Sequence, residues 1–222
     1  MVLSMYNDGN QLRFLTDVEI EELINNGDLI IEPIIDRKYQ IQSVGIDIRL
    51  DTRIRLFRPA RTGLMSVEDE ISEDEYYEIV ELKVEYYEKE RQFCVDPIII
   101  HPSTFILAQS FEYICLPNNI MGFVDGRSSL ARRGIIIHAT AGSIEPGFRG
   151  HITLELGNIG QLPVKLYPLM RIANVHFVRV NEPKRPYKGQ FQFQVKMKPP
   201  KPDEDLLLIL GKKSFKQVSH IT

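Results

Sequence analysis

Two segments of the sequence combine residue types that could act on a small anionic ligand. The first runs Gly126-Arg127-Ser128-Ser129-Leu130-Ala131-Arg132. A glycine followed by hydroxyls and backbone N–H groups at a helix start, with arginines on either side, is a suitable cradle for an anion. A capped surface helix with solvated arginines has the same pattern, and the spacing alone does not decide between the two.

The second segment is a strand expected at residues 151–156. With a period of two, its aliphatic residues face the core, whereas His151, Thr153 and Glu155 face the opposite side. A carboxylate among β-branched and aliphatic neighbours suits proton transfer to and from a ligand. A glutamate that simply faces solvent fits the pattern too, and from these residues alone it is the better interpretation.

Two further segments have the composition of ligand-binding loops. Residues 142–150 form a loop bounded by glycines, which suits a close approach of backbone to a ligand. Residues 185–194 mix aromatic, amide and basic side chains after a proline-bounded break, as a flap that closes over a ligand would. The alternative for residues 185–194 is an edge strand, which their composition favours.

The elements that must position these segments are mainly strands. Thr16 to Glu19 has the capping-box pattern and predicts a helix that ends at Gly27. Apolar–polar alternation predicts strands at residues 45–50 and 52–56, the second with Arg53 and Arg55 facing outward. Shorter β-branched runs between Pro and Gly residues predict further strands at 98–100, 105–109, 135–138, 152–156, 164–166 and 172–180.

This spacing of strands and turns indicates a β-sandwich or β-barrel-like fold, interrupted by one short helix that starts at Ser128 and is closed by Gly134. Residues 199–202, Pro-Pro-Lys-Pro, begin a stiff linker. We therefore expect one domain over residues 1–198 and a C-terminal extension over residues 199–222.

The composition is that of a globular protein with an uneven charge. The 222 residues are 43% hydrophobic and 26% charged, with a net charge of −3. An acidic insert at about residues 66–92 carries −8 between Glu68 and Arg91, which leaves +5 for the rest of the chain. A solvated hairpin or helix face is the simplest interpretation of the insert. The mildly basic remainder suits a small anionic ligand, while the overall acidity argues against nucleic acid as a partner.

Several other functional classes are excluded by the sequence. The two cysteines, Cys94 and Cys115, form no CxxC pair, and the five histidines show no metal-ligand spacing, so a disulfide scaffold and a zinc site are not expected. No stretch approaches the roughly 20 apolar residues of a membrane span, and the first ten residues lack a secretory layout. We expect a cytoplasmic protein without a membrane partner.

Taken together, the motifs resemble the dCTP deaminase family of the trimeric dUTPase-like superfamily. The resemblance covers about residues 15–194, and its most specific part is an ordered string. That string comprises Gly126–Arg132, His138-Ala139-Thr140-Ala141, Glu145-Pro146-Gly147-Phe148 and Ile152-Thr153-Leu154-Glu155. It implies a mainly β, distorted barrel-like fold of dUTPase type, with a short N-terminal helix and a short helix at the active site. It also implies a homotrimer with active sites between subunits.

The family resemblance implies deamination of dCTP to dUTP and ammonia without zinc, with Mg²⁺ bound through the triphosphate. The zinc deaminase signature H-x-E…P-C-x-x-C is absent from the chain. By resemblance, Glu155 is the proton shuttle, Arg132 holds Glu155 and the attacking water, and Ser128 bonds the water or the intermediate. The implied substrate contacts are Arg127, Ser129, Ala139, Ala141, Glu145, Phe148, Tyr187, Lys188 and Gln194.

The chain departs from the family at two positions that bear on the product. Glu145 stands where the family usually has aspartate, at a position associated with the sugar hydroxyl and, in dUTPases, with the hydrolytic water. Gln190 replaces a phosphate-binding lysine, for which Lys188 is a substitute. We expect dUTP as the product. The alternatives are a bifunctional enzyme that releases dUMP and diphosphate, and a nucleotide-binding relative without catalysis.

Overall fold

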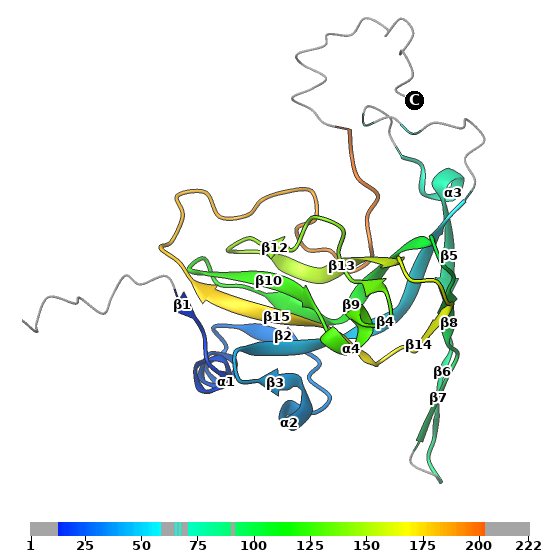
Figure 1. Cartoon of the computed structure of the whole chain (residues 1–222). Helices are drawn as coiled ribbons and strands as arrows, with labels where there is room; N and C mark the ends of the chain where they lie inside the picture. Colours follow the sequence, from blue (N-terminus) through cyan, green and yellow to red (C-terminus); the bar gives the residue numbers. More distant parts are fainter. Residues whose placement is uncertain (1–12, 59–64, 66, 68–70, 90–91, 203–222) are drawn as a thin grey trace, which may run out of the picture.

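The computed structural model describes residues 13–58, 65, 67, 71–89 and 92–202, and in these residues it shows a curled, antiparallel β fold (Figure 1). The strands of the large sheet are β1 (Arg13–Phe14), β2 (Ile30–Glu32), β3 (Ile41–Gln42), β4 (Gly45–Phe57), β5 (Tyr77–Glu81), β9 (Phe105–Cys115), β10 (Ile120–Gly126), β11 (Ile135–Ile136), β12 (Ser143–Ile144), β13 (Arg149–Asn158) and β15 (Arg171–Arg179). Their order is β11-β13-β9-β4-β15-β10-β12, with β1 beside β15, β2 beside β9, and β3 and β5 beside β4. The predicted mainly β, barrel-like fold is confirmed.

Two small sheets and four short helices complete the described fold. The small sheets pair β6 (Val84–Tyr87) with β7 (Gln92–Val95), and β8 (Ile98–Ile100) with β14 (Val164–Leu166). The helices are α1 (Asp17–Asn26), α2 (Arg37–Gln40), α3 (Glu73–Tyr76) and α4 (Ser128–Ala131). Residues 203–222, most of the predicted C-terminal extension, lie outside the described residues.

Helix α1 begins and ends where its local sequence predicts. The backbone N–H of Thr16 donates to the Glu19 carboxylate at 3.1 Å, as a capping box requires. Gly27 ends the helix with φ of 78°, a left-handed conformation that glycine adopts without steric cost. Helix α4 ends differently, with Arg132 as its C-cap, and the predicted stop Gly134 lies two residues further on, with φ of 84° and its N–H donating to Ala131 O at 2.9 Å.

Strands β4 and β9 are longer than their sequence patterns indicate, whereas the strand predicted at residues 135–138 is shortened to Ile135–Ile136. Residues 45–50 and 52–56 form the single strand β4, with a register shift against β9 between Leu50 and Ile54. Strand β10 is absent from the sequence prediction because two glycines and an aspartate interrupt its alternation. In the structure, Gly122 allows close packing: a Cβ there would lie 3.1 Å from the Ile144 side chain on β12, which would have to shift slightly.

The core lies on the concave side of the sheet and is aliphatic. Phe177 of β15 is its largest fully buried side chain, packed among buried residues of the long strands. A second, smaller cluster lies on the other face of β4 and β9, and consists of Ile71, Tyr76, Tyr77, Leu107 and Met197. The second cluster joins the acidic insert to residues close to the C-terminal end of the described chain.

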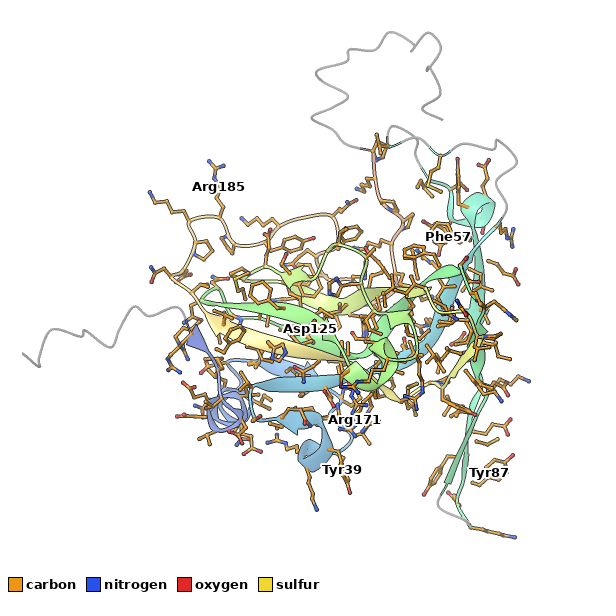
Figure 2. The ribbon with its side chains drawn as sticks, viewed as in Figure 1. Tyr39, Phe57, Tyr87, Asp125, Arg171 and Arg185 are labelled. Carbon is orange, nitrogen blue, oxygen red and sulfur yellow. The ribbon has the colours of Figure 1, made fainter. Side chains whose placement is uncertain are left out.

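The acidic insert contains the expected hairpin, formed by β6 and β7, which projects from the body (Figure 1). Tyr87 lies near the far end of the hairpin and is exposed (Figure 2). The prediction for Arg55 is wrong, because its side chain is buried rather than outward. Arg55 does point away from the main core, but the insert and the C-terminal segment cover that face, a long-range contact that alternation along β4 cannot reveal.

A buried polar network ties α2 to strands β4 and β9. Glu112 is fully buried, and its carboxylate accepts hydrogen bonds from the Gln40 side chain and the Arg49 N–H, each at 2.8 Å. Gln40 Oε1 in turn accepts from the N–H groups of Ile35 and Asp36. Burial raises the pKa of Glu112 to about 7, against the opposing effect of its hydrogen bonds and of Arg49.

Glu112 should make folding stability depend on pH. Because its pKa rises from 4.5 to about 7 on folding, the folded chain binds the proton more tightly, so the contribution is complete below 4.5 and is lost as the pH rises through 7. The loss amounts to roughly 3 kcal/mol at about 1.4 kcal/mol per pKa unit. Urea unfolding across this range should show the decline in the native protein and a flatter profile in Glu112→Gln. Equal slopes in the two proteins would contradict this assignment.

Candidate active site

Glu155 lies in the middle of β13, and its carboxylate is held in place by the loop that follows β11. Its side chain is half-buried, and Oε2 accepts a hydrogen bond from the Ala139 N–H at 2.8 Å. The Glu155 N–H donates to Ile137 O at 2.9 Å, so residues 137–139 fix both the backbone and the side chain. Oε1 has no hydrogen-bond partner within the described part of the chain, which leaves one oxygen available for proton transfer.

A pocket of about 440 Å³ opens in front of Glu155. His151, Thr153 and Glu155 all line it, so the strand face that the alternation sets opposite the core is the face of the pocket. Six of the predicted site residues line the same pocket: Ala141, Glu145, Phe148, Glu155, Tyr187 and Gln194. Glu155 therefore does not simply face solvent.

Residues 185–194 close over one side of the pocket and form no regular strand. The Tyr187 N–H donates to Pro146 O at 2.9 Å, and the Tyr187 ring lies 5.8 Å from the Phe148 ring. Gln194 is buried, and its side-chain amide donates to Thr153 Oγ1 at 2.7 Å and to His151 O at 3.2 Å. The flap interpretation is thus nearer to the structure than the edge strand. Lys188 is exposed and lies outside the pocket lining.

Helix α4 presents the second group of predicted site residues, at a different place on the molecule. Ser128, Ser129 and Arg132 are exposed, and none of their side chains makes a hydrogen bond or ion pair to a described residue. Among the described residues that line the Glu155 pocket, none belongs to α4. One copy of the chain therefore does not bring Ser128 or Arg132 into the pocket of Glu155.

Arg127, just before α4, is oriented by a buried carboxylate. Its Nε lies 3.4 Å from Asp47 Oδ2, which also lies 3.0 Å from the Arg171 Nη1. Asp47 is 4% exposed, and its other oxygen accepts from the Asn174 side chain at 2.9 Å. Arg171 extends towards Tyr39, whose ring and carbonyl it contacts (Figure 2). Strands β4 and β15 thus fix the start of the cradle.

Sequence reasoning missed part of the site. The alternation of β13 already contains the signal for His151 and Thr153, since both share the face of Glu155. Asp47 can be recognised as the partner of Arg127 and Arg171 only once β15 is known to lie beside β4. His138 Nδ1 is buried without a hydrogen-bond partner among the described residues, which no local pattern indicates.

Two structural observations bear on cofactors and membranes. Within residues 13–58 and 71–202, apart from the gaps in the description, no three His, Cys, Asp or Glu side chains are grouped as metal ligands. Among the described helices, the longest is α1 with ten residues, and none is long and apolar enough to cross a bilayer.

A curled antiparallel sheet that carries a pocket, a held carboxylate and a closing flap defines a small-molecule site of enzymatic type. Comparison with known proteins supports this interpretation of the site. Residues 14–180 match the family model described as dCTP deaminase-like. The solved 2′-deoxycytidine 5′-triphosphate deaminase of Agrobacterium tumefaciens has a similar fold, with a TM-score of 0.56 at 19% identity, over 76% of this chain and 48% of that one.

Curated relatives give the same family with higher identity. A protein of Nanoarchaeum equitans named "dCTP deaminase, dUMP-forming" is 42% identical over 78% of this chain and 88% of its own length. One of the same name from Methanothermobacter thermautotrophicus is 38% identical over 79% and 84%. A "dCTP deaminase" of Natronomonas pharaonis is 37% identical over 79% and 86%.

The chain belongs to the dCTP deaminase family, which is a family of enzymes. The predicted family and the predicted enzyme class are confirmed by these comparisons. Two of the three relatives are named for forming dUMP. Their names favour the bifunctional alternative over the prediction that dUTP is the released product.

Proposed function

We propose that this chain is a cytoplasmic, bifunctional dCTP deaminase that converts dCTP and two water molecules into ammonia, dUMP and diphosphate. The observation that carries the proposal is the Glu155 carboxylate, half-buried in the pocket, with Oε2 held by the Ala139 N–H and Oε1 unoccupied by described protein groups. Relatives of 42% and 38% identity that are named for forming dUMP support the second half of the reaction.

In the first step, water adds to C4 of the cytosine. Glu155 takes a proton from the water and delivers it to N3, so that C4 becomes tetrahedral in a neutral intermediate and Glu155 is again a carboxylate. Glu155 then moves the proton of the C4 hydroxyl to the 4-amino group, the C4–N bond breaks, and ammonia leaves as the C4 carbonyl of dUTP forms. The backbone groups of Ala139 and Ala141 would position the base, which is supported by the hydrogen bond from Ala139 to Glu155 and by Ala141 in the pocket lining.

Arg132 and Ser128 would act from a second copy of the chain. In one copy they are exposed on α4 and do not line the Glu155 pocket. In a homotrimer with sites between subunits, Arg132 of one copy would hold Glu155 of its neighbour together with the water, and Ser128 would bond the tetrahedral intermediate. The free side chains of α4 support this assignment, because they have no partner among the described residues of their own copy.

The triphosphate would lie on Arg127, Ser128 and Ser129, where N–H groups, hydroxyls and a guanidinium oriented by Asp47 suit phosphate oxygens. Lys188 would contribute from the flap. Mg²⁺ would be bound through the phosphates. When bound, the ion neutralises negative charge on the triphosphate.

In the second step, water attacks the α-phosphorus of dUTP, and diphosphate leaves from dUMP. Glu145 is exposed and lines the pocket together with Phe148 and Tyr187. Its side chain is one methylene longer than that of the aspartate in the family pattern. We assign it the same two tasks, which are to bond the sugar hydroxyl and to orient the hydrolytic water.

The proposal is tested by incubating the protein with dCTP and Mg²⁺ and separating the nucleotides by anion exchange. We expect dUMP and diphosphate in equal amounts with ammonia. Glu145→Ala should still release ammonia, but dUMP formation should fall by about 100-fold, so that dUTP accumulates, because the water is no longer oriented. Glu145→Asp should keep dUMP as the product.

Other outcomes would assign a different function. Release of dUTP by the native protein would make it a deaminase without the second activity. Nucleotide binding without ammonia release would make the chain a non-catalytic relative. Either result contradicts the bifunctional proposal.

A further inference from the structure

The Glu155 pocket has a second side, built by parts of the chain that the family motifs do not include. We call this side the outer wall and define it as Phe57, Ile71, Tyr77, Phe105 and Leu107, all of which line the pocket. Ile71 and Tyr77 belong to the acidic insert. Lys198 and Pro200 continue the lining from a C-terminal arm, defined as residues 195–200. The outer wall is apolar and largely aromatic.

Strand register connects the outer wall directly to Glu155. Glu155 of β13 pairs with Leu107 of β9, which pairs with Arg55 of β4, so the three residues form one row on one face of the sheet. With strands about 4.8 Å apart, Arg55 and Glu155 are roughly 10 Å apart along this row. The neighbouring row places Phe105 next to Phe57 and Phe57 next to Tyr77, with ring centroids 5.5 and 4.9 Å apart.

Arg55 fastens both the insert and the arm to this face. Its Nη2 contacts the Glu73 carboxylate of α3 and also the Met197 carbonyl of the arm. Its guanidinium lies 5.5 Å from the Tyr77 ring centre. The Met197 N–H donates to Gln109 on β9 at 3.2 Å, and the Met197 side chain packs in the second cluster with Ile71 and Tyr77. One buried cation therefore joins three separate segments.

The arginine is not explained by packing alone. Its side chain is 4% exposed, and Nη1 is buried without a hydrogen-bond partner among the described residues. A buried donor without a partner costs free energy, and an apolar side chain of similar length would avoid that cost. Buried polar groups that reduce stability in this way are concentrated at functional sites, where they hold other residues in position.

Charge indicates which end of a nucleotide the outer wall receives. The insert is strongly acidic, and α3 alone adds Glu73, Asp74 and Glu75 beside the wall. Phosphates are repelled from this side, whereas an uncharged aromatic base is not. Aromatic side chains bind the faces and edges of nucleobases well, and Glu155 must itself reach the base for deamination.

We propose that the insert and the C-terminal arm, fastened by Arg55, form a base-binding wall, so that Phe57 and Tyr77 determine affinity for the base end of the nucleotide and Arg55 is the positioning residue. The proposal rests on the function proposed above, because it takes a deoxycytidine nucleotide as the ligand. It concerns binding, however, and can be tested where no turnover takes place.

Calorimetric titration in a Glu155→Gln background provides that test. Adding Arg55→Met or Phe57→Ala should weaken dCTP binding by about tenfold, the amount expected for loss of aromatic contacts, with inorganic tripolyphosphate binding unchanged. Arg55→Lys should restore part of the affinity, since it keeps the charge. In otherwise native protein, the KM for dCTP should rise with little change in kcat, because the wall binds ground and transition states alike.

Arg53→Met is the matched control. Arg53 lies on the same strand and the same face, but it is partly exposed, with 35% of its side chain accessible, and pairs with Glu81 of the insert at 3.9 Å. It should bind dCTP within about twofold of the background, as expected for a surface ion pair. Equal weakening of dCTP and tripolyphosphate would overturn the proposal, and so would unchanged dCTP binding in Phe57→Ala, which leaves the Arg55 contacts in place. Failure of the proposed function would appear differently, as a native protein that binds dCTP but releases no ammonia.

Discussion

Glu155→Gln should abolish ammonia release from dCTP while nucleotide binding is retained. Glutamine keeps the shape of the side chain and can still accept the Ala139 N–H, so the loop at residues 137–139 stays in place. It cannot take a proton from water or deliver one to N3. Loss of a positioned acid–base group typically costs about 10²- to 10⁴-fold in rate, and we expect a loss of this size. Ammonia release measured by a coupled assay gives the rate.

The control is Glu21→Gln, on the exposed face of α1 and away from the pocket, which should match the native rate. Calorimetry with dCTP establishes that the inactive variant still binds. Activity within a few-fold of the native protein would remove Glu155 from the proton-transfer step. Loss of binding as well as turnover would show that Glu155 holds the nucleotide rather than moving a proton.

Arg132→Ala should also lose deamination, by about 10²-fold or more, because the attacking water and the neighbouring Glu155 would no longer be held. A stronger expectation follows from the separation of α4 and the Glu155 pocket within one copy. If the site lies between subunits, an Arg132→Ala copy and a Glu155→Gln copy each supply what the other lacks. Co-expression of the two with different tags and purification of the mixed trimer should restore activity to about one third of native, because one of the three sites in each mixed trimer has both residues intact.

Oligomers of two differently tagged Glu155→Gln copies are the control and should stay inactive. Light scattering on the native protein should give the mass of a trimer. A monomeric mass would contradict the assembly, and mixed oligomers as inactive as their parents would place Arg132 and Glu155 of the same copy in one site. Native kinetics in Arg132→Ala alone would exclude that residue from the mechanism.

Features with a local cause could be predicted from the sequence. The capping box and Gly27 define α1, and the alternation at residues 151–156 places Glu155, Thr153 and His151 on one face. That face could not be recognised as a pocket, because its other sides come from residues 141–148 and from the flap. Local patterns fix the direction of a side chain, whereas its surroundings depend on segments distant in the chain.

Arg55 and strand β10 both show that local patterns do not reveal contacts between distant segments. Alternation correctly directs Arg55 away from the main core, but the residues that bury it come from the insert and from Met197. Strand β10 carries glycine where a neighbouring strand needs room, so its sequence has the composition of a turn. In both cases, contacts between distant segments decide the outcome.

The ion pairs of Asp47 with Arg127 and Arg171 affect how the protein responds to salt. Asp47 is almost completely buried and lies between the guanidinium groups of Arg127 and Arg171, so dissolved ions screen these contacts far less than they screen charges at the surface. A nucleotide approaching from solution is subject to the full screening. Ionic strength therefore changes how fast the nucleotide arrives, whereas the geometry that receives its phosphates stays the same.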